Sequence, residues 1–245
     1  MKIFALYNIK GGVGKTAAAV NLAYLSAREE RVTLLWDLDP QGAASYCLGE
    51  KGKLKGGSKA LLRAKRLDGD LIRRTAYDRL DLLPADFSYR HLDLALSEDK
   101  RPERRFRKLL ENLDMDYHHI FIDCPPGITL TSESMFEAAD VLVVPVIPAT
   151  LSLRTLDQID GFLKKAELEH LNRLAFYSMV DRRKGLHRRL VDLRHDHDFL
   201  FSTIPYASDV ERMAEQRAPL MSYAPKSRAA QAYESLWSEL KQVIA

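Results

Sequence analysis

The sequence has little cysteine and no long uninterrupted apolar run. Its 245 residues include two cysteines, Cys47 and Cys124, which lie far apart and form no C-x-x-C pair. This disfavours both a disulfide scaffold and a thiolate zinc site. No run of about 18 uncharged apolar residues is present, and the chain opens directly on an alternating apolar segment without a signal-peptide layout. We therefore expect a cytoplasmic protein with unpaired thiols.

Internal repeats and low-complexity linkers are also absent. Hydrophobic residues make up 46% of the chain and charged residues 29%, which suits a globular protein with a sizeable core. Apolar runs of strand length alternate with amphipathic segments of helix length, a pattern typical of a parallel sheet covered by helices. We predict one doubly wound α/β domain over residues 1–245, with a mostly parallel sheet flanked by helices on both faces. Strands are expected at residues 2–7, 32–36, 80–83, 119–122, 141–146, 174–179 and 199–204, and helices at 15–27, 102–113, 153–166, 185–196, 209–216 and 228–244.

Charge is unevenly distributed along the chain. The net charge is only +3, yet residues 51–75 contain nine Lys and Arg against Asp68 and Asp70, and residues 182–194 contain six against Asp192. Two basic segments on an acidic body are expected of a protein that binds a polyanion, although solvated surface segments give the same pattern. Residues 49–76, which include the first basic segment and are rich in Gly and Lys, are expected to contain a mobile loop or a short basic helix.

A glycine-rich loop follows the first expected strand. Residues 8–16 read N-I-K-G-G-V-G-K-T, and an Ala-rich helical segment begins at once. Glycines allow backbone N–H groups to surround a polyphosphate, and the positive end of the next helix adds a matching field. Lys15 is expected to reach the β- and γ-phosphates of ATP, and the Thr16 hydroxyl to ligate Mg²⁺. The residues expected to bind nucleotide here are Gly11, Gly12, Val13, Gly14, Lys15, Thr16 and Ala17.

Carboxylates end two other apolar strands. Asp37 and Asp39 alternate at the carboxyl edge of the second strand, where ligands bind in this architecture. An alternative is that these residues only cap a turn with Pro40 and Gly42. Asp123 closes a hydrophobic strand in the manner of a Walker B motif, which predicts a magnesium ligand.

Together these motifs resemble the ParA/MinD family of dimeric P-loop ATPases. K-G-G-V-G-K-T at residues 10–16 is similar to the family's deviant Walker A motif, and D-L-D-P-Q-G at 37–42 and D-C-P-P-G at 123–127 resemble its acidic segments. The resemblance implies that Lys10 reaches phosphates bound by a partner subunit, that Asp37 and Asp123 serve Mg²⁺, and that Asp39 positions or activates the attacking water. Ala17 departs from the pattern by replacing a hydroxyl residue that contacts the α-phosphate.

The resemblance extends to the C-terminal third of the chain. Met179 and Pro205 occupy positions that shape the adenine pocket in relatives. The ParA branch implies an ATP-bound homodimer on nucleoid DNA and a partner that links it to cargo and stimulates hydrolysis. For nonspecific binding of double-stranded DNA, which requires only clustered cations, the residues implied are Arg182, Arg183, Lys184, Arg188, Arg189, Lys226 and Arg228.

Two other functions fit the sequence less well. A MinD-like membrane switch would need an amphipathic basic final helix, but Lys241 is the only base after Arg228, so core packing is the better interpretation of that helix's apolar stripe. A metallocluster or reductase relative would need further cysteine ligands. The family positions plasmids, chromosomes, carboxysomes and chemotaxis arrays, and the sequence does not indicate which cargo applies here.

Overall fold

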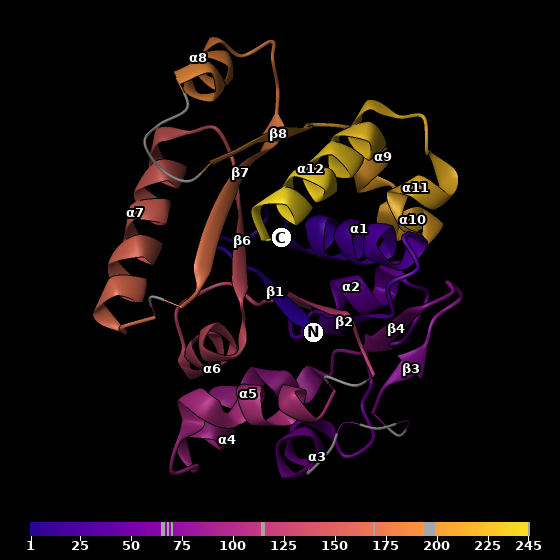
Figure 1. The fold of residues 1–245 in the computed structure, drawn as a ribbon, viewed down its shortest axis with the longest axis vertical. Helices are drawn as coiled ribbons and strands as arrows, with labels where there is room; N and C mark the ends of the chain where they lie inside the picture. The colour runs from indigo at the N-terminus through magenta and orange to yellow at the C-terminus, as the bar shows by residue number, and fades with distance from the viewer. Residues whose placement is uncertain are drawn as a thin grey trace.

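The chain folds around one eight-stranded sheet. The computed structural model describes residues 1–64, 67, 69, 71–113, 116–168, 170–193 and 199–244 (Figure 1). Strand order is β3-β4-β2-β5-β1-β6-β7-β8, and every neighbouring pair is parallel except β3 with β4. This confirms the predicted fold class. The strands are β1 Lys2–Leu6, β2 Thr33–Asp37, β3 Arg73–Arg74, β4 Leu80–Leu83, β5 His119–Asp123, β6 Val141–Val146, β7 Asn172–Val180 and β8 Phe199–Pro205.

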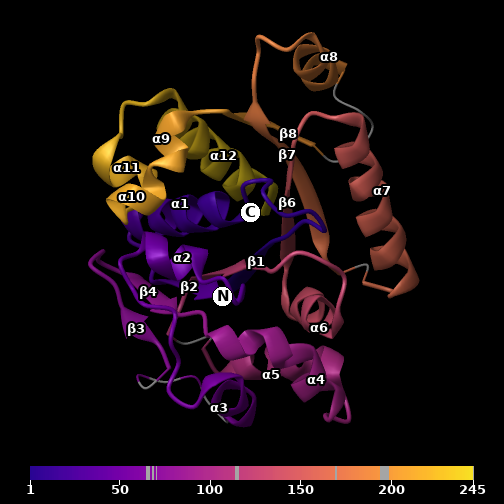
Figure 2. The ribbon, with the colours of Figure 1, turned by 180° about the vertical axis from the view of Figure 1, so that it is seen from behind.

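Helices cover both faces of this sheet (Figures 1 and 2). One face carries α1 and α12 with the short helices α2 and α9 to α11, and the other carries α3 to α7. The α-helices are α1 Lys15–Arg28, α2 Ala43–Cys47, α3 Gly57–Arg63, α4 Leu92–Ser97, α5 Arg105–Leu110, α6 Leu130–Ala138, α7 Thr150–Lys165, α8 Gly185–Leu193, α9 Ser208–Glu211, α10 Met213–Gln216, α11 Leu220–Tyr223 and α12 Arg228–Ile244. The 3₁₀ turns are η1 Phe87–His91, η2 Pro102–Arg104 and η3 Glu111–Leu113.

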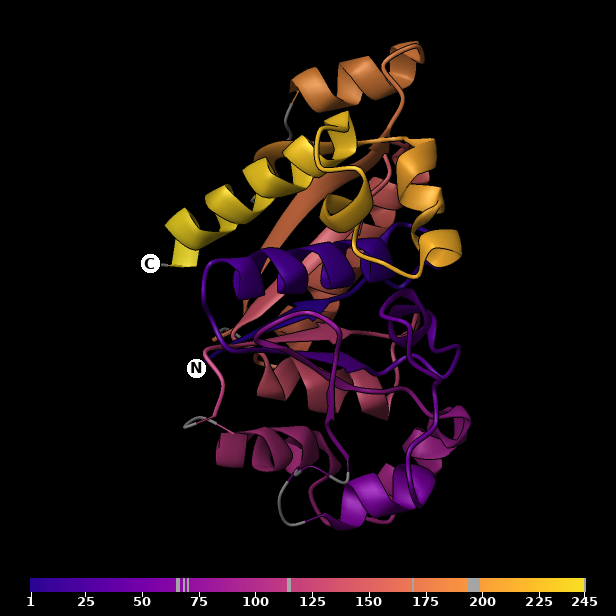
Figure 3. The same ribbon diagram turned by 90° about the vertical axis from the view of Figure 1, so that its right-hand side faces the viewer.

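Two hydrophobic clusters explain why the strands read as continuous apolar runs. On one face Phe4, Leu22 and Trp237 pack together, and on the other Trp36 and Phe136 do so. The side view in Figure 3 shows these helical layers on either side of the sheet. Strands enclosed in this way bury side chains on both faces, and every residue of β6 is buried. Both cysteines are likewise buried and free, as predicted.

Strand register brings three loops to one edge. Leu6 of β1 and Asp37 of β2 both align with Asp123 of β5. Because these strands are parallel, the segments that follow them leave the sheet side by side. The glycine-rich loop, the segment after Asp37 and the segment after Asp123 therefore meet at the carboxyl edge.

The predicted strands are confirmed within about two residues, but several helices differ. The helix expected at 102–113 is divided into η2, α5 and η3, and that expected at 209–216 into α9 and α10. The sequence reading did not predict β3, α2, α4, α6 or α11.

The end of the helix expected at 185–196 lies outside the described residues, as do Lys65, Arg66, Asp68 and Asp70. The described part of residues 49–76 contains the short helix α3, which agrees with the expected short basic helix. No helix in the described ranges is long and apolar enough to cross a membrane.

Candidate nucleotide and magnesium site

The loop between β1 and α1 has the backbone of an anion cradle. Gly12 and Gly14 have φ of +70° and +96°, a region that only glycine enters readily. A Cβ on Gly14 would lie 2.8 Å from the Ser178 hydroxyl, so a larger residue is excluded. Gly14 is also the N-cap of α1, and no side chain caps that helix. The first amides of α1 are thus free to bind an anion.

The loop is tied to its neighbours by specific hydrogen bonds. Asn8 donates from Nδ2 to the Pro145 carbonyl at 2.9 Å and accepts from the Lys10 amide at 2.9 Å. The Gly127 amide donates to the Ile9 carbonyl at 3.2 Å, which links the loop to the segment after Asp123. The two loops are therefore in direct contact.

The two predicted lysines donate to different acceptors. Lys15 is buried, and its Nζ donates to the Lys10 carbonyl at 3.1 Å. Burial lowers the pKa of the Lys15 ammonium, an effect partly offset by Asp123 and Asp39. The Nζ of Lys10 instead donates to the Leu151 carbonyl at 2.9 Å, within the same subunit at the start of α7.

Asp37 and Asp123 form a fully buried carboxylate pair on adjacent strands. Oδ2 of Asp37 accepts from both the amide and the hydroxyl of Ser45, each at 2.7 Å. Within the described ranges, Oδ1 of Asp37 and both oxygens of Asp123 have no donor in hydrogen-bonding geometry. Burial raises the pKa of both groups, and the pKa of Asp123 is raised further by Asp37.

This carboxylate pair fits Mg²⁺ by its chemistry. Buried carboxylate oxygens without donors require a cation or water. The described residues contain no cluster of three or more His, Cys, Asp or Glu that could enclose a metal. Such an incomplete set suits Mg²⁺, which keeps several waters and takes its remaining ligands from phosphate. Thr16, the second residue of α1, lies close enough to Asp123 for its hydroxyl to favour the charged form of that carboxylate.

Asp39 differs from the buried pair because it is only half-buried. Its Oδ1 accepts from the Gln41 amide at 2.9 Å, and its carbonyl accepts from the Gly42 amide. The turn-capping interpretation of Asp39 is thus part of its structure. The capping contact engages Oδ1, one of the two carboxylate oxygens.

The predicted adenine and DNA residues lie at the other end of this edge. Pro205 lines a cavity of about 710 Å³ together with Arg182, Arg183 and Arg228, while Met179 has a left-handed backbone with φ of +55°. Arg183 pairs with Asp181 at 2.9 Å, the one ion pair of the predicted DNA set in the described part of the chain. All members of that set are exposed: Arg182, Arg183, Lys184, Arg188, Arg189, Lys226 and Arg228.

Sequence reasoning missed two residues of the site. Ser45 anchors Asp37, and its Oγ also accepts from the Ala85 amide at 3.0 Å. Ser178 closes over Gly14. The only sequence signal for Ser45 was a hydroxyl residue shortly after the D-L-D-P-Q-G segment.

Comparison with known proteins identifies relatives of this chain in sequence and in fold. A model of the AAA domain family matches residues 1–176. The sporulation initiation inhibitor protein Soj of Bacillus subtilis is 31% identical over 98% of both chains. Cobyrinic acid a,c-diamide synthase from Mycobacterium smegmatis, solved with ADP and magnesium, is 25% identical and superposes with a TM-score of 0.83 over 99% of this chain and 94% of that one. The cell division ATPase MinD of Pyrococcus furiosus, 23% identical, gives a TM-score of 0.79 over 99% of both chains.

Proposed function

Because this chain belongs to the ParA/MinD family of P-loop ATPases, we propose that it is a Mg²⁺-dependent partition or positioning ATPase with slow intrinsic turnover. In this proposal ATP joins two copies of the chain, and the dimer binds double-stranded DNA without sequence preference. A cargo-adaptor protein then stimulates hydrolysis to ADP and phosphate. The single observation that carries the proposal is the buried pair Asp37 and Asp123 beside an uncapped glycine-rich loop.

In this proposal the residues that bind ATP, Mg²⁺ and the attacking water occupy different positions at the site. The loop amides and Lys15 would hold the polyphosphate, while Thr16, Asp37 and Asp123 would hold Mg²⁺ directly or through water. The bound cation would neutralise charge on the transferring phosphoryl group. Asp39, half-buried and held by its turn, would orient or activate the attacking water.

Lys10 has a separate role in this proposal. In the single chain its ammonium is engaged by the Leu151 carbonyl at 2.9 Å. To reach phosphates bound by a second copy, Lys10 would exchange that neutral acceptor for an anionic one. A cation placed there would stabilise charge that develops in the transition state.

The basic residues around α8 and the start of α12 support DNA as the polyanion. They are exposed, and apart from Arg183 they form no ion pair with a described residue. Free surface cations attract phosphates and release counterions whatever the base sequence. The proposed dimer would then act on nucleoid DNA.

The membrane-switch alternative is weakened by the final helix. Leu236, Trp237 and Leu240 of its apolar stripe are buried, and Trp237 packs edge-on against Phe4 and Phe121. These side chains stabilise the core and are not available to enter a lipid surface. Val243 is half-exposed at the end of the same helix and does not make a stripe by itself.

Replacement of Asp39 tests the proposed chemistry. Asp39→Ala should leave ATP affinity within a few-fold of the unmodified chain and slow phosphate release by at least about 100-fold, because the water loses its carboxylate partner. Binding is measured by fluorescent nucleotide titration and turnover by phosphate release in the presence of DNA. Lys15→Ala serves as the control that should lose nucleotide binding. Normal turnover in Asp39→Ala would remove Asp39 from this role.

A further inference from the structure

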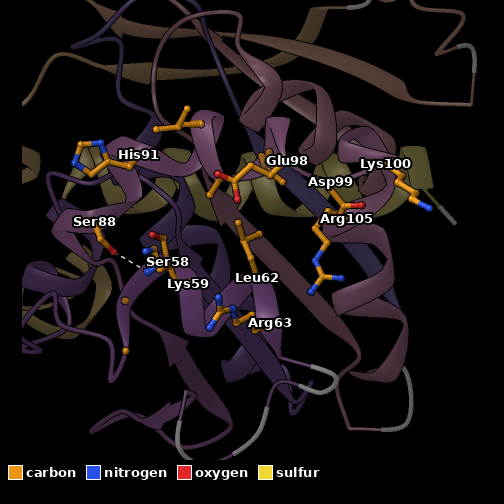
Figure 4. A pocket seen from close by; sticks show the side chains of 15 residues that line it. Ser58, Lys59, Leu62, Arg63, Ser88, His91, Glu98, Asp99, Lys100 and Arg105 are labelled. Atoms are coloured by element: carbon orange, nitrogen blue, oxygen red, sulfur yellow. Dashed lines mark hydrogen bonds between the residues drawn. The ribbon is translucent and has the colours of Figure 1, made fainter.

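A second hollow lies away from the nucleotide site, between α3, η1, α4 and the start of α5. Its volume is about 730 Å³, and its lining includes no residue of the glycine-rich loop or the carboxylate pair. Figure 4 shows Leu62 in the middle of this hollow, with Ser88 and His91 to one side and Arg105 to the other. Leu94 also lines it and is 68% exposed. An apolar floor is therefore left open to solvent.

The wall beside α3 is held by a close backbone approach. Gly57 has φ of +60°, and a Cβ there would lie 2.6 Å from the Ser88 hydroxyl. The Ser58 amide donates to that hydroxyl at 2.7 Å, and the Leu54 amide donates to Asp86 at 2.8 Å. These bonds fasten α3 to η1, so the hollow has a defined shape.

The rim and the adjoining surface are strongly basic. Residues 100–108 contain six Lys and Arg and the single acid Glu103. These six bases, together with Asp99 and Glu111, line a second hollow of about 550 Å³, which shares Asp99, Lys100 and Arg105 with the first. Arg107 pairs with Glu137 at 3.4 Å. Within the described part of the chain no ion pair involves the remaining bases of this rim: Lys59, Arg63, Lys100, Arg101, Arg104, Arg105 and Lys108.

We propose that these two joined hollows, the α3–α5 groove, dock an acidic peptide segment of a partner protein that carries apolar side chains. The free bases would pair with its carboxylates, while Leu62 and Leu94 would receive an apolar side chain. A duplex fits less well, because it offers no apolar group to a hollow lined by Leu62 and Leu94. The inference goes beyond the proposed ATPase function, since docking here requires no nucleotide.

A peptide titration tests the groove directly. The probe is a short fluorescent peptide that repeats Glu-Glu-Leu, titrated with the nucleotide-free chain and followed by anisotropy. We expect binding that weakens by at least about tenfold when Lys replaces Glu in the peptide, because attraction becomes repulsion. Replacing Leu by Ser in the peptide should weaken it about fivefold through lost apolar contact. Equal binding of all three peptides would overturn the proposal.

Variants of the chain locate the binding. The pair Lys59→Glu with Arg63→Glu should weaken the Glu-Glu-Leu peptide by at least about tenfold, and Leu94→Ser by about fivefold. All three positions are exposed, so the fold is expected to persist, which circular dichroism checks. The charge-matched control, Lys164→Glu with Lys165→Glu at the end of α7, should bind as the unmodified chain does. Unchanged affinity in both groove variants contradicts the proposal, as does a short DNA duplex that binds the groove while the peptide does not.

Discussion

Asp37 and Asp123 share one sequence pattern, an acid that ends a buried strand, yet their surroundings differ. Asp37 accepts two hydrogen bonds from Ser45, whereas neither oxygen of Asp123 has a donor in the described ranges. A buried carboxylate without donors destabilises the folded state unless it binds a cation or a proton. In the chain without ligand, Asp123 therefore lowers the free energy of unfolding.

This cost can be measured with Asp123→Asn. The neutral amide should raise the free energy of unfolding of the ligand-free chain at neutral pH by roughly 1–3 kcal/mol, because it removes a carboxyl group whose ionisation burial and Asp37 disfavour. The same variant should lose the additional stability that Mg²⁺ and ATP give to the unmodified chain. Denaturant unfolding with and without Mg²⁺ and ATP measures both effects.

The control for this prediction is Asp78→Asn. The Asp78 side chain is 91% exposed, so its replacement should change the free energy of unfolding very little. A ligand-free Asp123→Asn variant that is less stable than the unmodified chain would show that the carboxylate is satisfied by contacts other than those described.

The positions of residues that belong to a local motif could be predicted from the sequence, and the positions of residues brought in by folding could not. Lys15, Thr16 and Asp123 were placed by their motifs because strand, loop and helix follow one another directly. Ser45 reaches Asp37 only because Gly42, with φ of +67°, lets α2 fold back toward β2. No local pattern in the sequence predicts that α2 packs back against the end of β2.

At the scale of elements, strands were easier to predict than short helices. The central strands are apolar runs that the sheet buries on both faces, so their sequence and environment agree. The helix α6 was missed because Ser and Thr interrupt its apolar residues, and its start depends on a capping box between Thr129 and Ser132. Pro102 opens a 3₁₀ turn, and the predicted helix is divided from that point. Tertiary packing decides the boundaries of such short elements.

Four elements meet at His119, at the edge of the sheet opposite the nucleotide site. Its Nδ1 lies 2.8 Å from the Ser26 hydroxyl of α1, which lies 2.7 Å from the Thr33 hydroxyl of β2. Trp237 of α12 packs edge-on against the imidazole, with 5.5 Å between ring centroids. Burial lowers the pKa of His119 to about 4, and the positive charge of Arg31 adds to the effect.

This junction predicts how stability depends on pH. In the unfolded chain His119 binds a proton below its ordinary pKa of about 6.5, whereas in the folded chain it stays neutral down to a pKa of about 4. Stability from this group is therefore complete above pH 6.5 and is lost as pH falls. Because the imidazole is partly exposed to solvent, we expect His119 to contribute a loss of roughly 1–2 kcal/mol between about pH 7.5 and pH 5. The raised pKa values of Asp37 and Asp123 act in the opposite direction over the same range. Urea unfolding of the ligand-free chain at several pH values measures it.

The matched variant is His119→Phe, which removes the titrating group and leaves Ser26 and Thr33 to bond each other. Its absolute stability can change, so the comparison is between pH slopes. Between pH 7.5 and pH 5 the variant should lose less stability, or gain more, than the unmodified chain, because the contributions of Asp37 and Asp123 are the same in both. A slope as steep as that of the unmodified chain would assign the pH dependence to other groups.

At the scale of the whole molecule, the fold separates two basic surfaces, one at α8 and one at residues 100–108. The sequence predicted the basic segment at 182–194, which α8 carries on a projection from the end of β7 (Figure 1). It did not single out residues 100–108, because their charge is interrupted by apolar residues that fold into the core, such as Phe106. The net charge of +3 therefore hides two separate basic surfaces.

The surface at α8 predicts the salt dependence of DNA binding. With ATP, the chain should bind labelled duplexes of unrelated sequence with similar affinity, and with ADP it should bind them weakly. Replacing both Arg188 and Arg189 by Ala should reduce the slope of log affinity against log salt by roughly 2, because each phosphate contact contributes about 0.9. Fluorescence anisotropy at several KCl concentrations measures the slope.

The control is Lys164→Ala with Lys165→Ala, which makes the same charge change at the far end of α7 and should leave the slope unaltered. If both double variants lowered the slope equally, net charge rather than the α8 surface would govern binding.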